Sequence, residues 1–247
     1  MAKAGIKKKR KPKKKPAAKK LKGFLKRLFR YTAVIVALII MLPLALSVLY
    51  RIEGVKPIST LMLTRTLTLK PVNRHWAAIE DIAPALVQSV IMSEDGKFCS
   101  HNGVDWNALT TVIDGALDGA RTRGASTLTM QTVKNLFLWN SRSYLRKGLE
   151  IPLALWFDLV VPKKRILEIY LNIAEWDEVV FGAEAASRLY FKRSAENLTY
   201  RQAALLTTTL PNPRNRDAAK PSRHMIQVAK IINRRAKSSR AYIGCVQ

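Results

Sequence analysis

Two adjacent carboxylates, Glu94 and Asp95, are residues that could carry out acid–base chemistry. They lie in the segment SEDGKFCSHNG, whose glycines and asparagine predict a turn directly after the two acids. A carboxylate beside a turn can border a cleft and accept a proton from a substrate hydroxyl. Because charged residues are mostly solvated surface groups, the pair by itself is compatible with either role.

The segment GASTLTMQTVKN, residues 124–135, has the composition of a phosphate- and sugar-binding helix. Ser126 or Thr127 can cap a helix that continues through Leu138, and the start of a helix favours anions. An ordinary capped helix with a polar side explains the pattern equally well. The side chains that would share one helical face, at i, i+4, i+7 and i+8, are Thr127, Gln131, Lys134 and Asn135.

Arg146 and Glu150 are four residues apart and would meet on one face of a helix. An exposed pair of this kind contributes little to stability, so the spacing alone favours a surface ion pair. Inside a cleft, the same two groups would supply a cation and a second carboxylate. The spacing leaves both interpretations open.

Helices must position these groups, because apolar residues recur at helical spacing from about Ile82 onward. Before that point, the alternation in LMLTRTLTL, residues 61–69, favours a short extended strand within a linker. The predicted outer domain is therefore mainly α, with a small β element. Four predicted helices cover residues 83–94, 105–120, 126–138 and 217–241. Another begins at Ser141 and is bent by Pro152, and the next begins at Pro162. A capping box of Thr199 and Gln202 opens one more.

Residues 31–50, YTAVIVALIIMLPLALSVLY, contain no charged side chain and predict a transmembrane helix. A helix of this length spans about 30 Å, which matches the hydrocarbon core of a bilayer. A cleaved signal peptide is the alternative, but the apolar run is longer than a typical signal core and no small-x-small site follows it. The 15 Lys and Arg residues before it predict a cytoplasmic N-terminus and a periplasmic outer domain at the inner membrane.

Charge and cysteine content limit the classes of function. The formal net charge is +26, and the basic outer domain favours an anionic partner such as a phosphorylated substrate. Residues 1–23 lack the interleaved aromatics of a nucleic-acid-binding tail, so a topology signal without nucleic-acid binding is favoured. Two cysteines, Cys99 and Cys245, exclude a disulfide-rich scaffold, and unbonded cysteines are favoured over a bridge. The predicted organisation is a basic cytoplasmic tail (1–30), a transmembrane helix (31–50), a membrane-proximal linker (51–80) and the outer domain (81–247).

Five motifs together carry a resemblance that none of them carries alone. They are E-D-x-x-F-x-x-H-x-G (Glu94, Asp95, Phe98, His101, Gly103), G-x-S-T-x-T-x-Q-x-x-K-N (124–135), R-K-x-x-E with K-x-x-I-L-E-x-Y-L-N (146–150 and 163–172), G-A-E-A-A-S-x-x-Y-F (182–191) and A-A-L-L-x-x-x-L-P-N-P (203–213). Through these motifs the chain resembles glycosyltransferase family 51, the peptidoglycan glycosyltransferases, in their short monofunctional biosynthetic form. The sequence has no S-x-x-K motif and too few residues after Pro213 for a transpeptidase domain, which excludes a bifunctional synthase.

The resemblance implies a lysozyme-like, mainly α domain that joins lipid II to a lipid-linked glycan strand beside the membrane. The acceptor 4-hydroxyl would attack the donor anomeric carbon with inversion, and the lipid pyrophosphate would leave. Glu94 would be the general base, with Asp95 as a supporting acid. Lys134 and Arg146 would stabilise the charge of the leaving pyrophosphate.

Further roles follow from the same resemblance. Glu150 is the second family carboxylate and would order the cations, the leaving group or a bound divalent cation such as Mg²⁺ or Mn²⁺. No cofactor is otherwise implied. The remaining residues expected to bind substrate are Phe98, His101, Ser126, Thr127, Gln131, Asn135 and Lys163.

Two departures from the family pattern leave alternatives open. Asp177 and Val179 stand where the family usually has glycines, and a β-branched residue would be strained if positive φ were needed there. An inactive membrane-tethered scaffold that recruits other wall or division proteins is therefore one alternative. The other is a lytic enzyme that cleaves glycan on the same fold. Lys134 and Arg146 argue against it, because uncharged sugar links need no pyrophosphate-binding face.

Overall fold

The computed structural model describes residues 16–119, 124–141 and 143–247. The chain forms two compact units that meet between Leu42 and Pro43. Helix α1 (Pro16–Tyr50) includes a segment, Leu21–Tyr50, that is long and apolar enough to cross a membrane. Its side chains from 21 to 42 are exposed to the surroundings, as expected for lipid-facing residues. The helix also extends N-terminally beyond the predicted span and into the basic tail.

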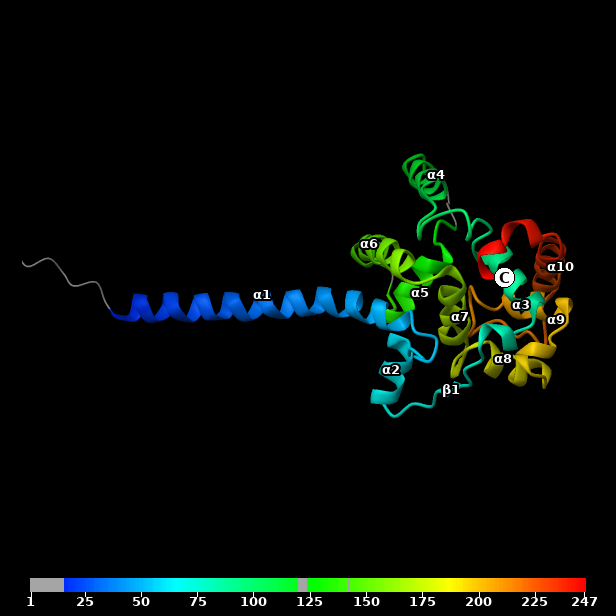
Figure 1. Cartoon of the computed structure of the whole chain (residues 1–247), viewed down its shortest axis with the longest axis horizontal. Helices are drawn as coiled ribbons and strands as arrows, with labels where there is room; N and C mark the ends of the chain where they lie inside the picture. Colours follow the sequence, from blue (N-terminus) through cyan, green and yellow to red (C-terminus); the bar gives the residue numbers. More distant parts are fainter. Residues whose placement is uncertain (1–15, 120–123, 142) are drawn as a thin grey trace, which may run out of the picture. The chain divides into compact units, whose positions relative to one another are not determined.

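The second unit is mainly helical, as predicted, and includes one small sheet (Figure 1). The elements of this unit are α2 (Thr60–Leu67), β1 (Asn73–Arg74), η1 (Ile79–Asp81), α3 (Pro84–Glu94), α4 (Trp106–Leu117), α5 (Leu128–Phe137), α6 (Tyr144–Val160), α7 (Lys163–Ile173), β2 (Glu175–Asp177), β3 (Val180–Phe181), α8 (Ala183–Phe191), η2 (Ala195–Asn197), α9 (Tyr200–Thr207), α10 (Arg223–Lys237), η3 (Arg240–Tyr242) and η4 (Gly244–Val246). The sheet has the strand order β1-β3-β2, with β1 parallel and β2 antiparallel to β3.

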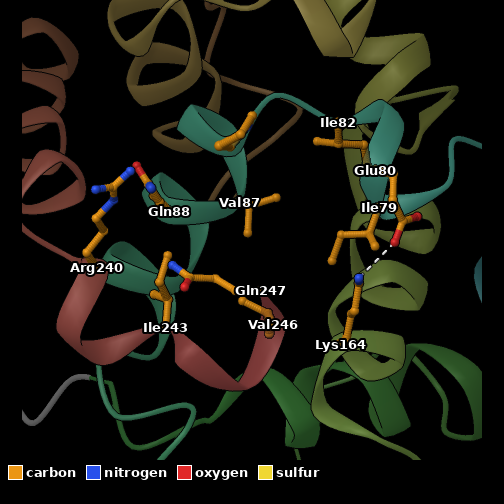
Figure 2. A pocket seen from close by; sticks show the side chains of 11 residues that line it. Ile79, Glu80, Ile82, Val87, Gln88, Lys164, Arg240, Ile243, Val246 and Gln247 are labelled. Atoms are coloured by element: carbon orange, nitrogen blue, oxygen red, sulfur yellow. Dashed lines mark ion pairs between the residues drawn. The ribbon is translucent and has the colours of Figure 1, made fainter.

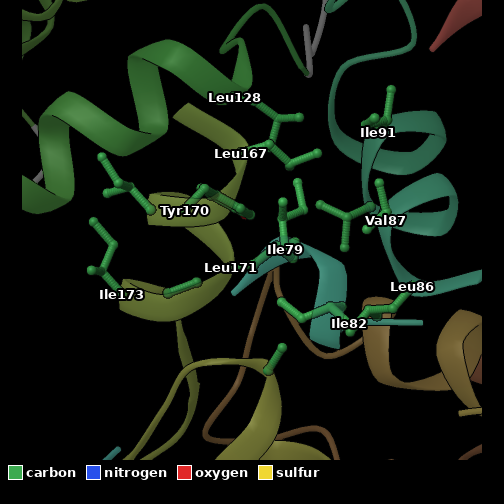
Figure 3. Packing of buried hydrophobic residues seen from close by; sticks show 14 of the residues in the cluster. Ile79, Ile82, Leu86, Val87, Ile91, Leu128, Leu167, Tyr170, Leu171 and Ile173 are labelled. Carbon is green, nitrogen blue, oxygen red and sulfur yellow. The ribbon is translucent and has the colours of Figure 1, made fainter. Parts of the chain in front are cut away.

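The core of this unit is built around α7 and α3 (Figure 3). Residues 165–173 of α7 are all buried, and so are residues 85–91 of α3. A helix that is buried on every side must pack against neighbours all around it. Helix α5 packs against α6 and α7, whereas α3, α9 and α10 pack on one another. The C-terminal end of α3 meets the N-terminal half of α5 through hydrogen bonds from Leu128 to Asp95 and from Gln131 to Glu94.

The predicted strand at residues 61–69 is wrong, because most of this segment forms helix α2. Ser59 caps the helix by accepting a hydrogen bond from the amide of Met62. Met62 and Arg65 are buried on one side, and the hydroxyl of Thr60 donates to the carbonyl of Leu138 over 2.7 Å. Tertiary packing therefore overrides the alternating pattern, which is the usual limit of a propensity argument.

Most of the predicted helix starts are confirmed, with three shifts. Thr127 caps α5, and the capping box of Thr199 and Gln202 opens α9. Helix α6 is capped by Ser143 rather than Ser141, and Pro162 is the residue before α7 rather than its first residue. The last long helix is shorter than the predicted 217–241. It begins after Ser222, because Pro221 inside a helix would lack an N–H donor and would clash with the preceding turn.

The end of α1 is fixed within the second unit by a buried arginine. The guanidinium of Arg165, in α7, donates to the backbone carbonyls of Tyr50, Ile52 and Val55 and pairs with Glu168. A buried guanidinium needs this full set of acceptors, since an unpaired one would be costly. The segment that follows the apolar helix is thereby held against the core.

Cys99 and Cys245 form a disulfide, with their Cα atoms 5.5 Å apart. The prediction of unbonded cysteines is therefore wrong. Counting could not reveal the bridge, because 146 residues separate the two cysteines along the chain and only folding brings them together. The bridge ties the C-terminal segment to the loop that follows Asp95.

Position 103 requires a glycine, because neither its backbone conformation nor the space around it suits a larger residue. It has φ of +85°, and an added Cβ would lie 2.5 Å from the carbonyl oxygen of Ala154. Replacing Gly103 with alanine is expected to lower the free energy of unfolding by about 2–5 kcal/mol, from backbone strain plus overpacking. Denaturant unfolding of the purified protein measures this loss. Gly96→Ala is the matched control, because Gly96 has open space around it, and equal stability of both variants would contradict the argument.

Candidate active site

Glu94 is the last residue of α3 and lines a cleft of about 550 Å³, here called the acid cleft. Other residues of this cleft include Asp95, Asp105, Ser126 and Thr127. Burial raises the pKa of the Glu94 carboxyl, and a hydrogen bond from Gln131 opposes that rise. When ionised, this half-buried carboxylate is a strong proton acceptor, as a general base must be.

Gln131 connects the acid cleft to a second cleft on α5. Its side-chain Nε2 donates to Oε2 of Glu94 over 3.1 Å, and its Oε1 accepts from the hydroxyl of Tyr170 over 3.2 Å. The Tyr170 side chain is buried in α7, and burial holds its pKa well above the usual range, so the hydroxyl stays protonated and donates. The amide of Gln131 is therefore fixed in orientation with its NH₂ toward the carboxylate.

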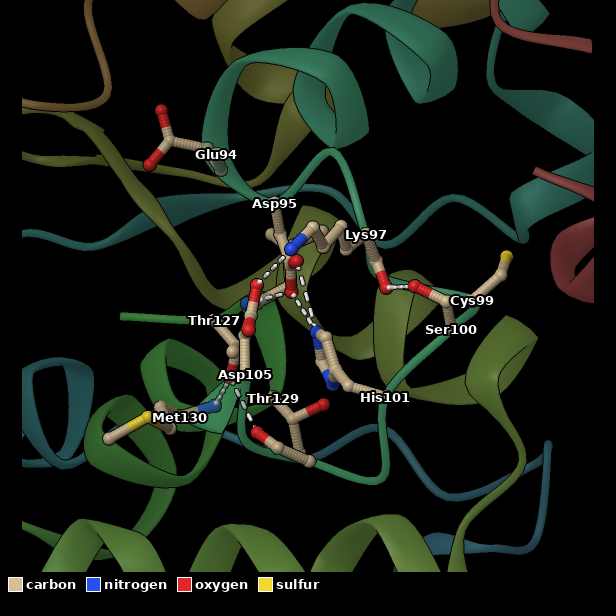
Figure 4. Close-up of polar contacts among 12 residues, drawn as sticks. Glu94, Asp95, Lys97, Cys99, Ser100, His101, Asp105, Thr127, Thr129 and Met130 are labelled. Carbon is tan, nitrogen blue, oxygen red and sulfur yellow. Dashed lines mark hydrogen bonds and ion pairs between the residues drawn. The ribbon is translucent and has the colours of Figure 1, made fainter. Parts of the chain in front are cut away.

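Asp95 points away from Glu94 and binds inward (Figure 4). Both of its oxygens lie 3.0 Å from Nε2 of His101, and Oδ2 also accepts from the amide of Leu128 over 2.9 Å. The carboxylate thus joins the end of α3 to the first residue of α5. In this geometry Asp95 positions Glu94 and the helix start, with its own lone pairs largely occupied.

Behind Asp95, a buried network includes three residues that the family resemblance placed in substrate binding. The Phe98 side chain is fully buried in the core, and Nζ of Lys163 lies 4.7 Å from its ring centroid. Nζ of Lys163 donates to the carbonyl of His101 over 2.7 Å and to Asp158 over 2.6 Å. The structure therefore brings Phe98, His101 and Lys163 together behind the cleft wall instead of on it.

The second cleft, here called the cationic cleft, has a volume of about 480 Å³ and contains Lys134 and Arg146. Gln131, Asn135 and Tyr170 also line it. Burial and the nearby Arg146 lower the pKa of Lys134. A partly desolvated pair of cations is a strong site for a polyanion such as a pyrophosphate.

Glu150 lies behind the cationic cleft and is only 3% exposed. One of its oxygens accepts from Arg146 and the other from Lys147, over 2.9 Å. Nζ of Lys147 also donates to the hydroxyl of Ser126 over 2.7 Å. Burial and its two cationic neighbours lower the pKa of Lys147 to about 8. Glu150 therefore holds two cations: Arg146, which lines the cationic cleft, and Lys147, which binds Ser126 of the acid cleft.

The surroundings of Glu150 do not fit a divalent cation. Mg²⁺ and Mn²⁺ prefer several oxygen ligands, whereas both oxygens of Glu150 are engaged by cations. Over the residues that the structure describes, no group of three or more His, Cys, Asp or Glu side chains is arranged as a metal site. The structure therefore gives no support to the divalent cation predicted at Glu150.

The loop with the two departures from the family pattern is unstrained. Of the described non-glycine residues, only Leu69 and Lys192 have positive φ, so Asp177 and Val179 adopt ordinary backbone conformations. Asp177 accepts a hydrogen bond from the hydroxyl of Tyr190, and the Val179 carbonyl accepts from the amide of Asn73. The expected strain at Val179 is therefore wrong.

Several residues in or beside the two clefts are not predicted as site residues by the sequence. Tyr170 and Lys147 fall inside the recognised motifs, and only their contacts reveal what they hold. Glu175 lines the cationic cleft between Arg65 and Arg214, at 3.7 Å and 3.2 Å. No local pattern could have predicted that carboxylate, because its partners come from distant segments.

Comparison with known proteins places the chain in a family. The Transglycosylase family model matches residues 61–237. Similar proteins called "Biosynthetic peptidoglycan transglycosylase" occur in Brucella suis (59% identity, covering 86% of this chain and 95% of the relative), Agrobacterium fabrum (55%, 84% and 92%) and Mesorhizobium japonicum (51%, 90% and 95%). The motifs, the mainly helical fold and these matches agree, and the chain therefore belongs to the transglycosylase family.

Proposed function

We propose that this chain is a peptidoglycan glycosyltransferase that polymerises lipid II into glycan strands and releases undecaprenyl pyrophosphate. The observation that carries the proposal is the hydrogen bond from Gln131, which lines the cationic cleft, to Glu94, which lines the acid cleft. An acceptor sugar at Glu94 and a donor whose pyrophosphate lies at the cations can then meet beside Gln131. The names of the relatives describe the same class of reaction.

In the proposed reaction, the carboxylate of Glu94 accepts the proton of the acceptor's 4-hydroxyl. The oxygen then forms a bond to the donor's anomeric carbon on the face opposite the lipid pyrophosphate. The bond from that carbon to the pyrophosphate oxygen breaks, and the configuration inverts. A base within hydrogen-bond reach contributes about 10²–10⁴-fold to such a step.

Lys134 and Arg146 supply positive charge for the leaving pyrophosphate. Arg146 is already oriented before the reaction by its pairing with Glu150, and Lys134 is half-buried beside it in the same cleft. Preorganised charges stabilise a transition state more than mobile ones do. This cluster also disfavours the lytic alternative, because cleaving an uncharged sugar link requires no pyrophosphate site.

The direct test offers purified full-length protein either lipid II or preformed glycan. Strand formation from lipid II, with no shortening of preformed glycan, is the expected result. A chelator is included in parallel, and activity should persist because Glu150 is engaged by cations. Shortening of glycan without polymerisation of lipid II would overturn the proposal in favour of a lytic enzyme.

The activity should depend on pH through Glu94. Burial raises the pKa of this carboxyl, and only the ionised form can accept a proton, so kcat/KM should fall as the pH drops through a value above the usual range for glutamate. Gln131→Leu removes a hydrogen bond that lowers this pKa, so its acid limb should lie at higher pH. The pH profiles of kcat/KM measure both effects. Glu196→Gln, at an exposed carboxyl outside both clefts, is the control, and an unmoved limb in Gln131→Leu would refute the assignment of the base.

We further propose that α1 anchors the chain in the inner membrane with its N-terminus in the cytoplasm and residues 51–247 in the periplasm. The charge before residue 31 supports this orientation. The Cys99–Cys245 bridge supports it too, since disulfides persist in oxidising compartments. Protease added to spheroplasts should digest the domain, and maleimide should label the two cysteines only after reduction. A protected domain or freely labelled thiols would contradict this topology.

A further inference from the structure

Part of the wall of the acid cleft comes from the C-terminal end of the chain. Arg235, from the last turn of α10, and Tyr242, from η3, line the same cleft as Glu94 and Asp95. The family model ends at residue 237, so Tyr242 lies outside it. The proposed reaction gives neither of these side chains a role.

This wall is held firmly in place. Ile243 and Val246 are buried in the main core, and Figure 2 shows them beside Val87 of α3. The adjacent Cys245 is bonded to Cys99, four residues after Asp95. Arg235 and Tyr242 are thus presented to the cleft from a rigid support rather than from a loose tail.

The cleft is lined by charges of both signs. Glu94, Asp95 and Asp105 line it, and Lys97 already pairs with Asp105 over 3.5 Å. Arg235 is exposed and forms no ion pair with any of the described residues. Its guanidinium is therefore available to an anion that enters the cleft.

We propose that Arg235 and Tyr242 bind a free carboxylate of the peptide that the substrate's sugar carries at Glu94, an inference that rests on the proposed function. A guanidinium fork matches a carboxylate in two hydrogen bonds. Tyr242 adds a hydroxyl and an apolar ring, which suit a peptide group. A pyrophosphate carries more charge than the single Arg235 can pair, whereas the cationic cleft offers it both Lys134 and Arg146.

The test compares two precursors, lipid II with its natural peptide and lipid II whose peptide carboxyls are amidated. For the natural precursor, Arg235→Gln should lower kcat/KM about 10-fold, the size expected for one charge-assisted contact. With the amidated precursor, kcat/KM of the unaltered chain should be lower by a similar factor. Arg235→Gln should then lower kcat/KM on that precursor by less than about 2-fold, since the contact is already gone. Arg234→Gln, at the neighbouring exposed arginine outside both clefts, should change neither rate.

Each outcome decides the matter. An equal loss on both precursors, or no loss from Arg235→Gln on the natural one, would overturn the peptide contact while strand formation still upholds the proposed function. If the unaltered chain made no strands from either precursor, the proposed function would fail and this contact with it. Tyr242→Ala gives a second measurement, with the same expected dependence on the precursor.

Discussion

Glu94→Gln should lower glycan polymerisation from lipid II by about 10²–10⁴-fold, the range that a general base contributes. Glutamine keeps the size of the side chain and can still bind the amide of Gln131, but it cannot accept the proton of the attacking hydroxyl. The fold should be preserved, because burial already disfavours the ionised form of this carboxyl. Initial rates with purified protein, together with circular dichroism and unfolding curves, measure both effects.

The control for this loss is Glu196→Gln, which removes one negative charge from an exposed carboxyl outside both clefts. It should retain the rate of the unaltered chain. Polymerisation by Glu94→Gln at the unaltered rate would remove the base from the proposed mechanism. A loss shared equally by both variants would point to a general effect of charge.

Glu150→Gln should reduce both activity and stability. The change leaves Arg146 and Lys147 as poorly compensated cations beside a buried amide, so the free energy of unfolding should fall by about 3–5 kcal/mol. Polymerisation should fall about 10²–10³-fold, because the cations are no longer held where the leaving pyrophosphate forms. Denaturant unfolding and initial rates measure the two losses separately.

A double variant separates these two effects. Adding Lys147→Met to Glu150→Gln removes one uncompensated cation, so part of the stability should return. Activity should not recover, since Arg146 still lacks the carboxylate that orients it. Recovery of activity together with stability would mean that Glu150 acts only through folding and has no part in ordering the cations.

The sequence predicted the helical elements well wherever local chemistry decides them. Thr127 caps α5, and the capping box at Thr199 opens α9, because both depend on side chains three residues apart. The alternation in residues 61–69 predicted a strand wrongly, since burial of Met62 and Arg65 against distant segments selects a helix there. Local propensity is a weak guide where such contacts dominate.

The candidate site was predicted in part. The five motifs include Glu94, Gln131 and Lys134, and the structure places these side chains in two clefts linked by the hydrogen bond from Gln131 to Glu94. The motifs could not separate residues on the cleft walls from residues behind them. Phe98 and Lys163 belong to the same motifs, yet they lie in a buried network that supports Asp95.

By itself, the sequence determined the long apolar helix, the mainly helical domain and the family, because hydropathy, capping and motif order are properties of nearby residues. Tertiary structure alone decided which groups meet. Tyr170 orients Gln131 from 39 residues away, and Cys245 reaches Cys99 across 146. Arg235 lines the same cleft as Glu94 for the same reason: α10 packs on α3, and no local pattern encodes packing between segments so far apart in the chain.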